Sequence, residues 1–405
     1  MKLIERSECL SKLSLLIDTP DIKVITGVRR SGKSKLMDRF RRELAARKPK
    51  ANIIYIDLVL FKNKKLLTHQ ALHDYVEKKR VRGKNYLFID EVQLCEGFEK
   101  AINSLHASER YDIYLTGSNA FLLSSDLATL FTGRTMQVHV MPFSFAEYRK
   151  YFSREKDMQT LFDRYMVEGG FSGSYIYPTA ELKAEYIREV YSTIITRDLV
   201  QKYNLPDSMV LDQVARFMMD NVSNISTPYG ISTTLKADRT DVSHVTVANY
   251  LHHLCDAYLL YEVRRYDLKG KKYLSSQSKY YLCDCGMRFA LLGRRNMDWG
   301  RVFENMVFLE LHRRGYDVYV GKLYEKEIDF VAQRGDEKLY IQVSDDISEP
   351  KTLNRETEPL LKIRDAYPKF LIARTRHEAY DYHGIKIVDL ASWLLTPPGS
   401  VPSVW

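Results

Sequence analysis

The residues best suited to chemistry are the eight of Gly27–Ser34, which combine two glycines, a lysine and a serine at fixed spacing. They follow the apolar run Ile22–Thr26 and precede a helical pattern that starts near Leu36, the context that a phosphate-binding loop needs. Such a loop curls on its glycines so that backbone N–H groups and a helix N-terminus point at phosphate oxygens. We therefore predict that the phosphates of a nucleotide are bound by Gly27, Val28, Arg29, Arg30, Ser31, Gly32, Lys33 and Ser34.

Two side chains of this loop have separate expected roles. The ammonium of Lys33 is expected to reach the β- and γ-phosphates, and the Ser34 hydroxyl is expected to be a ligand of Mg²⁺. A chance match of four fixed positions is the alternative. The strand before the loop and the helix after it argue against that alternative.

A pair of acids, Asp90 and Glu91, ends the apolar strand predicted at Tyr86–Ile89. At the C-terminal edge of a parallel sheet, such acids face the crevice where ligands bind. We expect Asp90 to hold Mg²⁺ through water and Glu91 to polarise an attacking water. Solvated acids at a strand end are the plainer interpretation, but the glycine loop about 55 residues upstream favours the chemical one.

Another strand, predicted at Tyr111–Leu115, ends in small polar residues. Of these, Ser118 and Asn119 are placed to hydrogen-bond the γ-phosphate or the attacking water, and the sequence does not decide between them. An ordinary turn is the alternative, because serine and asparagine are good turn formers.

An arginine, Arg134, lies on the loop before the last predicted strand of this region, Met136–Val140. In that position it is a candidate arginine finger, acting on the nucleotide of a neighbouring subunit and so requiring a homo-oligomer. A surface arginine without such a role is the alternative.

These motifs, followed by the run Met141–Tyr148, resemble the AAA-type ATPases of archaea and bacteria. The resemblance is to a group whose ATPase core precedes a C-terminal extension of poorly assigned function. It extends over most of the chain through Glu168–Phe171 and Thr196–Leu199. The resemblance implies an α/β P-loop fold with a parallel sheet of order 5-1-4-3-2, and ATP with Mg²⁺ as cofactors. On this basis residues 1–143 are the predicted core and residues 144–205 a helical lid, which opens on the capping box Ser144–Glu147.

Residues 206–293 have the pattern of a winged helix-turn-helix domain, with three helices before a basic β-hairpin. The helices are predicted at Ser208–Asn221, within Ile225–Leu235 and at Ser243–Ala257. In this interpretation the third helix faces the groove of double-stranded DNA, and the hairpin loop touches phosphates. A winged helix used only for packing is the alternative. The predicted groove residues are Ser243, His244, Thr246, Asn249 and His253, and the predicted phosphate contacts are Lys269, Lys271 and Lys272.

Residues 294–405 resemble a restriction-endonuclease-like α/β domain. Glu304 and Asp329 fit the acids of such a site, and Gln342 can stand at its second acidic position. Ser344 occupies the place of the lysine, so we expect no positive charge there and a degenerate nuclease. Retained polar groups without catalysis are an equal alternative.

Composition bounds these expectations. The chain has 405 residues, 45% of them hydrophobic, and a formal net charge of +9 that is compatible with a polyanionic partner. Its five scattered cysteines lack the spacing of a zinc site. We see no membrane span or secretion signal and expect a cytoplasmic protein. Three functions stay open: an ATPase acting on DNA, a nucleotide-dependent switch or scaffold that binds protein partners with little turnover, and an ATP-regulated nuclease.

Overall fold

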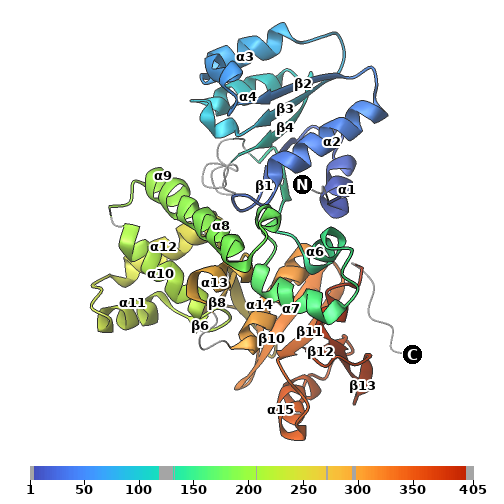
Figure 1. The fold of residues 1–405 in the computed structure, drawn as a ribbon, viewed down its shortest axis with the longest axis vertical. Helices are drawn as coiled ribbons and strands as arrows, with labels where there is room; N and C mark the ends of the chain where they lie inside the picture. The colour runs from blue at the N-terminus through green and yellow to red at the C-terminus, as the bar shows by residue number, and fades with distance from the viewer. Residues whose placement is uncertain are drawn as a thin grey trace.

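The computed structural model describes residues 4–117, 131, 133–206, 208–270, 272–293 and 298–397, without the side chains of residues 273–276. Figure 1 shows two bodies, one above the other. We call residues 4–143 the core body and residues 144–397 the C-terminal body. No helix among the described residues combines the length and the apolar character that crossing a bilayer requires.

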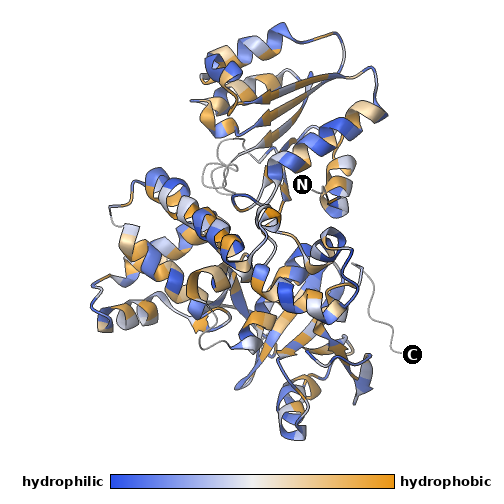
Figure 2. Cartoon of the chain, viewed as in Figure 1, coloured by the Kyte–Doolittle hydropathy of each residue, from blue (hydrophilic) through white to orange (hydrophobic). Residues whose placement is uncertain are grey.

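The core body is built on a parallel sheet of five strands in the order β2-β3-β4-β1-β5. This is the order 5-1-4-3-2 that the resemblance implied, and that prediction is confirmed. The three central strands are buried along their whole length, which explains their nearly continuous apolar sequences. Figure 2 shows the same strands as predominantly hydrophobic. The strands are β1 Ile22–Thr26, β2 Asn52–Asp57, β3 Asn85–Asp90, β4 Tyr111–Thr116 and β5 Thr135–His139.

Helices cover both faces of this sheet. Successive side chains of a strand point to opposite faces, and here both faces carry apolar side chains that need to be buried. In β3, Leu87 and Ile89 pack in one apolar cluster with residues of α3 and α4, whereas Tyr86 and Phe88 pack in another with residues of α1 and α2. The helices are α1 Ser7–Leu15, α2 Lys33–Arg47, α3 His69–Lys78 and α4 Phe98–Ala107, with the short 3-10 turns η1 Phe61–Leu66 and η2 Val92–Leu94.

A helical segment follows the core. Its first helix begins on the predicted capping box, in which the Glu147 N–H donates to Ser144 Oγ at 3.2 Å and the Ser144 N–H donates to Glu147 Oε2 at 2.9 Å. Its last three elements run on from one another, because the residues at their junctions keep helical backbone angles. The elements are α6 Phe145–Tyr151, α7 Met158–Glu168, η4 Ser172–Ile176, α8 Ala180–Thr193, the π-helix η5 Ile194–Val200 and α9 Gln201–Tyr203.

The remaining strands form a single sheet of nine strands, ordered β13-β14-β12-β11-β10-β9-β7-β8-β6. Parallel pairing of β7 with β9 joins the strands before residue 293 to those after it. One sheet therefore crosses the boundary that the sequence suggested between two domains. The elements are α10 Ser208–Asp220, β6 Ile225–Ser226, α11 Pro228–Ala237, α12 His244–Asp256, β7 Leu260–Asp267, β8 Lys272–Leu282, α13 Cys285–Leu292, α14 Trp299–Arg313, β9 Asp317–Leu323, β10 Lys326–Arg334, β11 Glu337–Ser344, α15 Pro350–Leu361, β12 Lys369–Ala373, β13 Tyr380–Tyr382, β14 Ile385–Asp389 and α16 Leu390–Trp393.

Candidate nucleotide-binding site

The loop Gly27–Gly32 connects the end of β1 to the start of α2, at the C-terminal edge of the core sheet. Its two glycines have φ angles of 138° and 102°, which residues with side chains rarely adopt. A Cβ atom on Gly27 would also lie 2.0 Å from the carbonyl oxygen of Val140. The N-cap of α2 is Gly32, which has no side chain to accept from the first N–H groups, and the first turn contains no acid. The amides at this helix end therefore suit an anion.

The side chain of Lys33, the first residue of α2, folds back onto the loop Gly27–Gly32. Its Nζ donates to the carbonyl oxygens of Gly27 at 2.7 Å and of Val28 at 3.2 Å. Burial lowers the pKa of Lys33 from 10.5 to about 8, although neighbouring acids favour its charged form. The ammonium is thus held next to the amides that would bind phosphate.

The two predicted metal-binding residues are brought together. Ser34, in the first turn of α2, donates from Oγ to Asp90 Oδ1 at 2.9 Å, and the Thr116 hydroxyl donates to the same carboxylate. Burial raises the pKa of Asp90, and these two hydrogen bonds oppose that effect. A serine hydroxyl beside a carboxylate offers the hard oxygen atoms that Mg²⁺ prefers, so the residues fit the ion.

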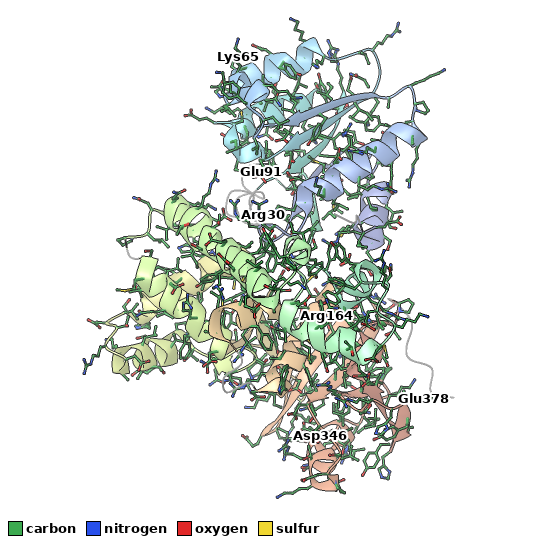
Figure 3. The ribbon with its side chains drawn as sticks, viewed as in Figure 1. Arg30, Lys65, Glu91, Arg164, Asp346 and Glu378 are labelled. Atoms are coloured by element: carbon green, nitrogen blue, oxygen red, sulfur yellow. The ribbon has the colours of Figure 1, made fainter. Side chains whose placement is uncertain are left out.

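Glu91 follows Asp90 with a left-handed backbone, φ 55° and ψ 50°. This conformation costs of order 1–3 kcal/mol for a residue other than glycine, and such strain is concentrated at functional sites. The backbone N–H of Glu91 donates to Thr116 Oγ1 at 3.2 Å. The Glu91 carboxylate accepts at Oε2 from Gln93 Nε2 at 2.5 Å. Figure 3 labels Glu91 and Arg30, which both lie at the edge of the core body that faces the C-terminal body.

Of the other predicted catalytic residues, the structure describes Arg134. Ser118 and Asn119 lie outside the described residues. The carbonyl oxygen of Arg134 accepts from Ile22 N at 2.9 Å, which places Arg134 at the opposite end of β1 from the glycine loop. Five strand residues span about 16 Å. Arg134 therefore lies at the far edge of the sheet from its own chain's loop.

Two residues that sequence reasoning missed hold the loop in place. Arg6 donates from its guanidinium to Ser31 O at 2.9 Å and to Met141 O at 2.7 Å, and its Nε pairs with Glu147 at 3.0 Å. Asp198, in η5, accepts from Arg29 Nε at 2.8 Å and from the second guanidinium nitrogen at 2.5 Å. Asp198 lies in the stretch Thr196–Leu199 that carried part of the resemblance, but no spacing links either residue to its partner in the loop, because the partners are far apart in sequence.

A second cluster of charges lies in the C-terminal body. Lys279 Nζ is 2.9 Å from Glu304 Oε1, 2.7 Å from Glu327 Oε1 and 3.8 Å from Asp329 Oδ1. The expectation of no positive charge at this place was wrong, because β8 supplies an ammonium that Ser344 does not. Burial alone would lower the pKa of Lys279, but the three carboxylates outweigh burial and raise it.

This cluster lines a cavity of about 600 Å³ that also includes Gln342 and Glu356. Gln342 Nε2 donates to Glu356 at 3.2 Å, and Asp329 accepts from Val343 N at 2.8 Å. Within the described part of the chain, no three histidine, cysteine or acidic side chains are arranged to hold a metal ion. The acids of the cluster instead share the single positive charge of Lys279.

The predicted groove residues of α12 differ in what they contact. The Thr246 hydroxyl lies 2.9 Å from Ser243 Oγ at the helix start, and the His253 ring stacks on Tyr203 with centroids 3.7 Å apart. Lys269 and Lys272 are exposed, and Lys271 lies outside the described residues. The exposed residues on the predicted groove face are Ser243, His244 and Asn249.

The parallel sheet, the glycine loop and the acids at the neighbouring strand end together define a P-loop NTPase core. Residues 19–149 match the model of an AAA domain family, and residues 159–298 match a domain of unknown function. An uncharacterized protein of Haemophilus influenzae is 37% identical over 399 residues, which is 97% of this chain and 99% of that protein. The chain therefore belongs to this family of AAA-domain proteins, and its core is an AAA-type ATPase core.

Two further proteins are similar to this chain. An uncharacterized protein of Methanocaldococcus jannaschii is 29% identical over 355 residues, covering 83% of this chain and 77% of that protein. A Walker-type ATPase of Pyrococcus abyssi superposes with a TM-score of 0.51 at 16% identity, over 71% of this chain and 96% of that chain. The latter similarity extends the shared fold beyond the core body.

Proposed function

We propose that the protein binds ATP with Mg²⁺, hydrolyses it, and couples the reaction to rearrangement of the C-terminal body against the core body. The observation that carries this proposal is the 2.9 Å contact between Ser34 and Asp90. It lies beside the N-terminus of α2, which has neither a capping side chain nor an acid in its first turn, and beside the buried ammonium of Lys33. The bound Mg²⁺ would offset charge on the β- and γ-phosphates. The chain's own residues supply the remaining groups.

Each residue has one proposed part in the reaction. Lys33 stabilises negative charge on the phosphates, and Ser34 with Asp90 holds the ion. Glu91 orients the water that attacks the γ-phosphorus in line, while the bond to the ADP oxygen breaks. Ser118 or Asn119 is proposed to hydrogen-bond the γ-phosphate or that water. Arg134 is proposed to act on the nucleotide of a neighbouring copy, in keeping with its place at the far edge of the sheet.

Phosphate release by the wild type and by Glu91→Gln tests hydrolysis. The variant keeps the size of the side chain and loses its charge, so we expect nucleotide binding to persist and turnover to fall roughly 10²–10⁴-fold. Glu96→Gln, an exposed acid nearby, is the matched control and should leave turnover unchanged. Equal background rates in the wild type and Glu91→Gln would refute hydrolysis and favour the switch or scaffold that binds protein partners.

For the C-terminal body we propose double-stranded DNA as the partner. Support comes from the order of a helix, a short strand, two helices and a hairpin over residues 208–282, in which β6 pairs with β8 as in a winged helix. The exposed Ser243, His244 and Asn249, with Lys269 and Lys272, supply polar and positive groups. ATP hydrolysis measured with and without duplex DNA across a salt series tests this. Stimulation should fade steeply with salt, and no stimulation at low salt would refute it.

An ATP-regulated nuclease is the second candidate, with residues 206–293 as the winged-helix domain and 294–405 as the nuclease-like domain. Lys279 favours it, because the ammonium beside Asp329 could stabilise a developing phosphate charge. The test is Mg²⁺-dependent cutting of DNA by the wild type and by Asp329→Ala. Cutting by the wild type that is lost in the variant would support the nuclease, and its absence from both would leave the domain degenerate.

A further inference from the structure

Two side chains of the phosphate loop are anchored in the C-terminal body rather than in the core body. Val28 is fully buried, and it packs in an apolar cluster whose other buried members all lie between residues 171 and 290. The next residue, Arg29, makes a two-pronged ion pair with Asp198, with donor–acceptor distances of 2.8 and 2.5 Å. The loop expected to hold the phosphates is therefore in direct contact with the part of the chain expected to move.

Asp198 is buried among apolar residues of its own element. It lies in η5, the π-helical stretch that continues α8, and it is 5% exposed. On either side of it along the helix, Ile194 and Leu199 are fully buried in the same apolar cluster as Val28. In turn, α8 packs against α13, and η5 packs against α10. A shift of Asp198 would thus be passed to several helices of the C-terminal body.

The position of Asp198 is unfavourable for a triphosphate. Its carboxylate is bonded to Arg29, a residue of the loop expected to hold the phosphates, so it lies beside that loop. Its negative charge also favours the charged form of Lys33, which is expected to bind the β- and γ-phosphates. The carboxylate occupies the edge of the Arg29 guanidinium formed by Nε and one terminal nitrogen. A guanidinium binds carboxylate and phosphate with the same planar fork, so the two anions compete for this edge of Arg29.

We propose that Asp198 is the nucleotide-sensing residue of the C-terminal body. In the nucleotide-free state its carboxylate holds Arg29 and joins η5 to the phosphate loop. When ATP binds, the γ-phosphate takes the guanidinium of Arg29 and the Asp198 carboxylate is released, which frees η5 and α8 to move. ADP has no γ-phosphate and leaves the ion pair in place. This proposal rests on the proposed binding of ATP at Gly27–Ser34 and adds how that binding is reported to the C-terminal body.

The test compares equilibrium binding of fluorescent ATP and ADP analogues, with Mg²⁺, to the intact wild type and to Asp198→Asn. Removing the competing charge should tighten ATP binding about fivefold or more and change ADP binding less than about twofold. Asp163→Asn is the matched control, because Asp163 also pairs with an arginine, Arg374, within the C-terminal body. It should leave both affinities unchanged. Arg29→Gln should weaken ATP binding, and the added Asp198→Asn change should then have a smaller effect on the ATP-to-ADP ratio.

Hydrogen exchange of the amides in residues 194–200 gives a second readout, whose main measurement is made on the wild type. A non-hydrolysable ATP analogue should speed their exchange in the wild type and leave it unchanged in Arg29→Gln. An unchanged ATP-to-ADP ratio in Asp198→Asn, or exchange that ATP does not alter, would overturn the proposal while nucleotide binding itself stands. A wild type that binds neither nucleotide would overturn the proposed function and this inference together.

Discussion

The hydroxyl of Ser34 lies 2.9 Å from the carboxylate of Asp90, although 56 residues separate them. Ser34 belongs to the first turn of α2 and Asp90 ends β3, so the contact joins a helix N-terminus to the C-terminal edge of the sheet. Thr116, at the end of β4, donates to the same carboxylate. Three elements thus fix Asp90 at the place where parallel α/β sheets bind their ligands.

Replacing Asp90 with asparagine should therefore weaken Mg²⁺-dependent nucleotide binding. We expect the affinity for ATP in the presence of Mg²⁺ to fall about 10- to 100-fold and the affinity without Mg²⁺ to change little, because only the ion's partner is lost. Titration of a fluorescent ATP analogue with and without Mg²⁺ measures both.

Asp57→Asn is the matched control, since Asp57 ends β2 directly beside Asp90 in the strand register. It accepts from the Val59 N–H at 3.0 Å in a local turn. If Asp57→Asn lowered Mg²⁺-dependent affinity as much as Asp90→Asn, the assignment of Asp90 to the ion would be wrong.

The pH dependence of nucleotide binding should report Lys33. Burial lowers its pKa to about 8 in the free protein, whereas bound phosphates favour the charged ammonium and raise that pKa. Below pH 8 the free protein already carries the charge. Above pH 8 binding must take up a proton, so the affinity for ATP should fall, approaching about tenfold per pH unit. Calorimetry in buffers of different ionisation enthalpy would detect the proton uptake.

Lys33→Arg separates this effect from other titrations, because an arginine stays charged throughout this range. Its ATP affinity, whatever its absolute value, should not decline between pH 8 and pH 9.5. A parallel decline in both proteins would assign the effect to another group, and Lys33→Ala binding ATP as tightly as the wild type would remove the phosphate site altogether.

Sequence reasoning succeeded where the signal is local. The glycine spacing, the apolar strands and the Ser144 capping box each lie within a few neighbouring residues, and the sheet order came from the resemblance that these motifs carried. It failed where a contact joins distant segments. Arg29 and Asp198 are 169 residues apart, and Arg6 and Glu147 are 141 apart, so neither pair leaves a spacing to recognise.

The charge at Lys279 was missed for a related reason. In the nuclease-like pattern the lysine is expected at the position on β11 that Ser344 occupies in this chain. The ammonium instead comes from β8, which adjoins this part of the molecule only because β7 pairs with β9 across the two halves of the sheet. A pairing between strands of separate predicted domains cannot be derived from either segment alone.

Gly27→Ala should damage the core more than a glycine replacement usually does. The added Cβ would lie 2.0 Å from the carbonyl oxygen of Val140, and the φ angle of Gly27 is 138°. Either the loop or Val140, the residue after β5, must therefore shift. We expect a cost of about 1–3 kcal/mol from this crowding. The melting temperature should therefore fall by roughly 2–12 °C, together with a loss of ATP binding.

Gly83→Ala is the matched comparison for this variant, because Gly83 also has a positive φ, 101°, but a Cβ there would meet no atom within 4 Å. It therefore carries the backbone strain without the clash. A melting temperature as low in Gly83→Ala as in Gly27→Ala would show that the contact with Val140 is not the cause.

Lys279→Met should destabilise the C-terminal body, because it leaves Glu304 and Asp329 buried without their counter-charge. Removing one partner of a buried ion pair costs about 3–5 kcal/mol. Lys272→Met, an exposed lysine on the same strand, is the control and should cost little.

Without the ammonium the pKa of each buried carboxyl rises further above its unfolded value, so the native state binds more protons than the unfolded state. The deficit of Lys279→Met should therefore shrink as the pH falls from 8 towards 5, which thermal denaturation across that range measures. A deficit independent of pH would mean that lost packing of the lysine side chain, and not unpaired charge, is responsible.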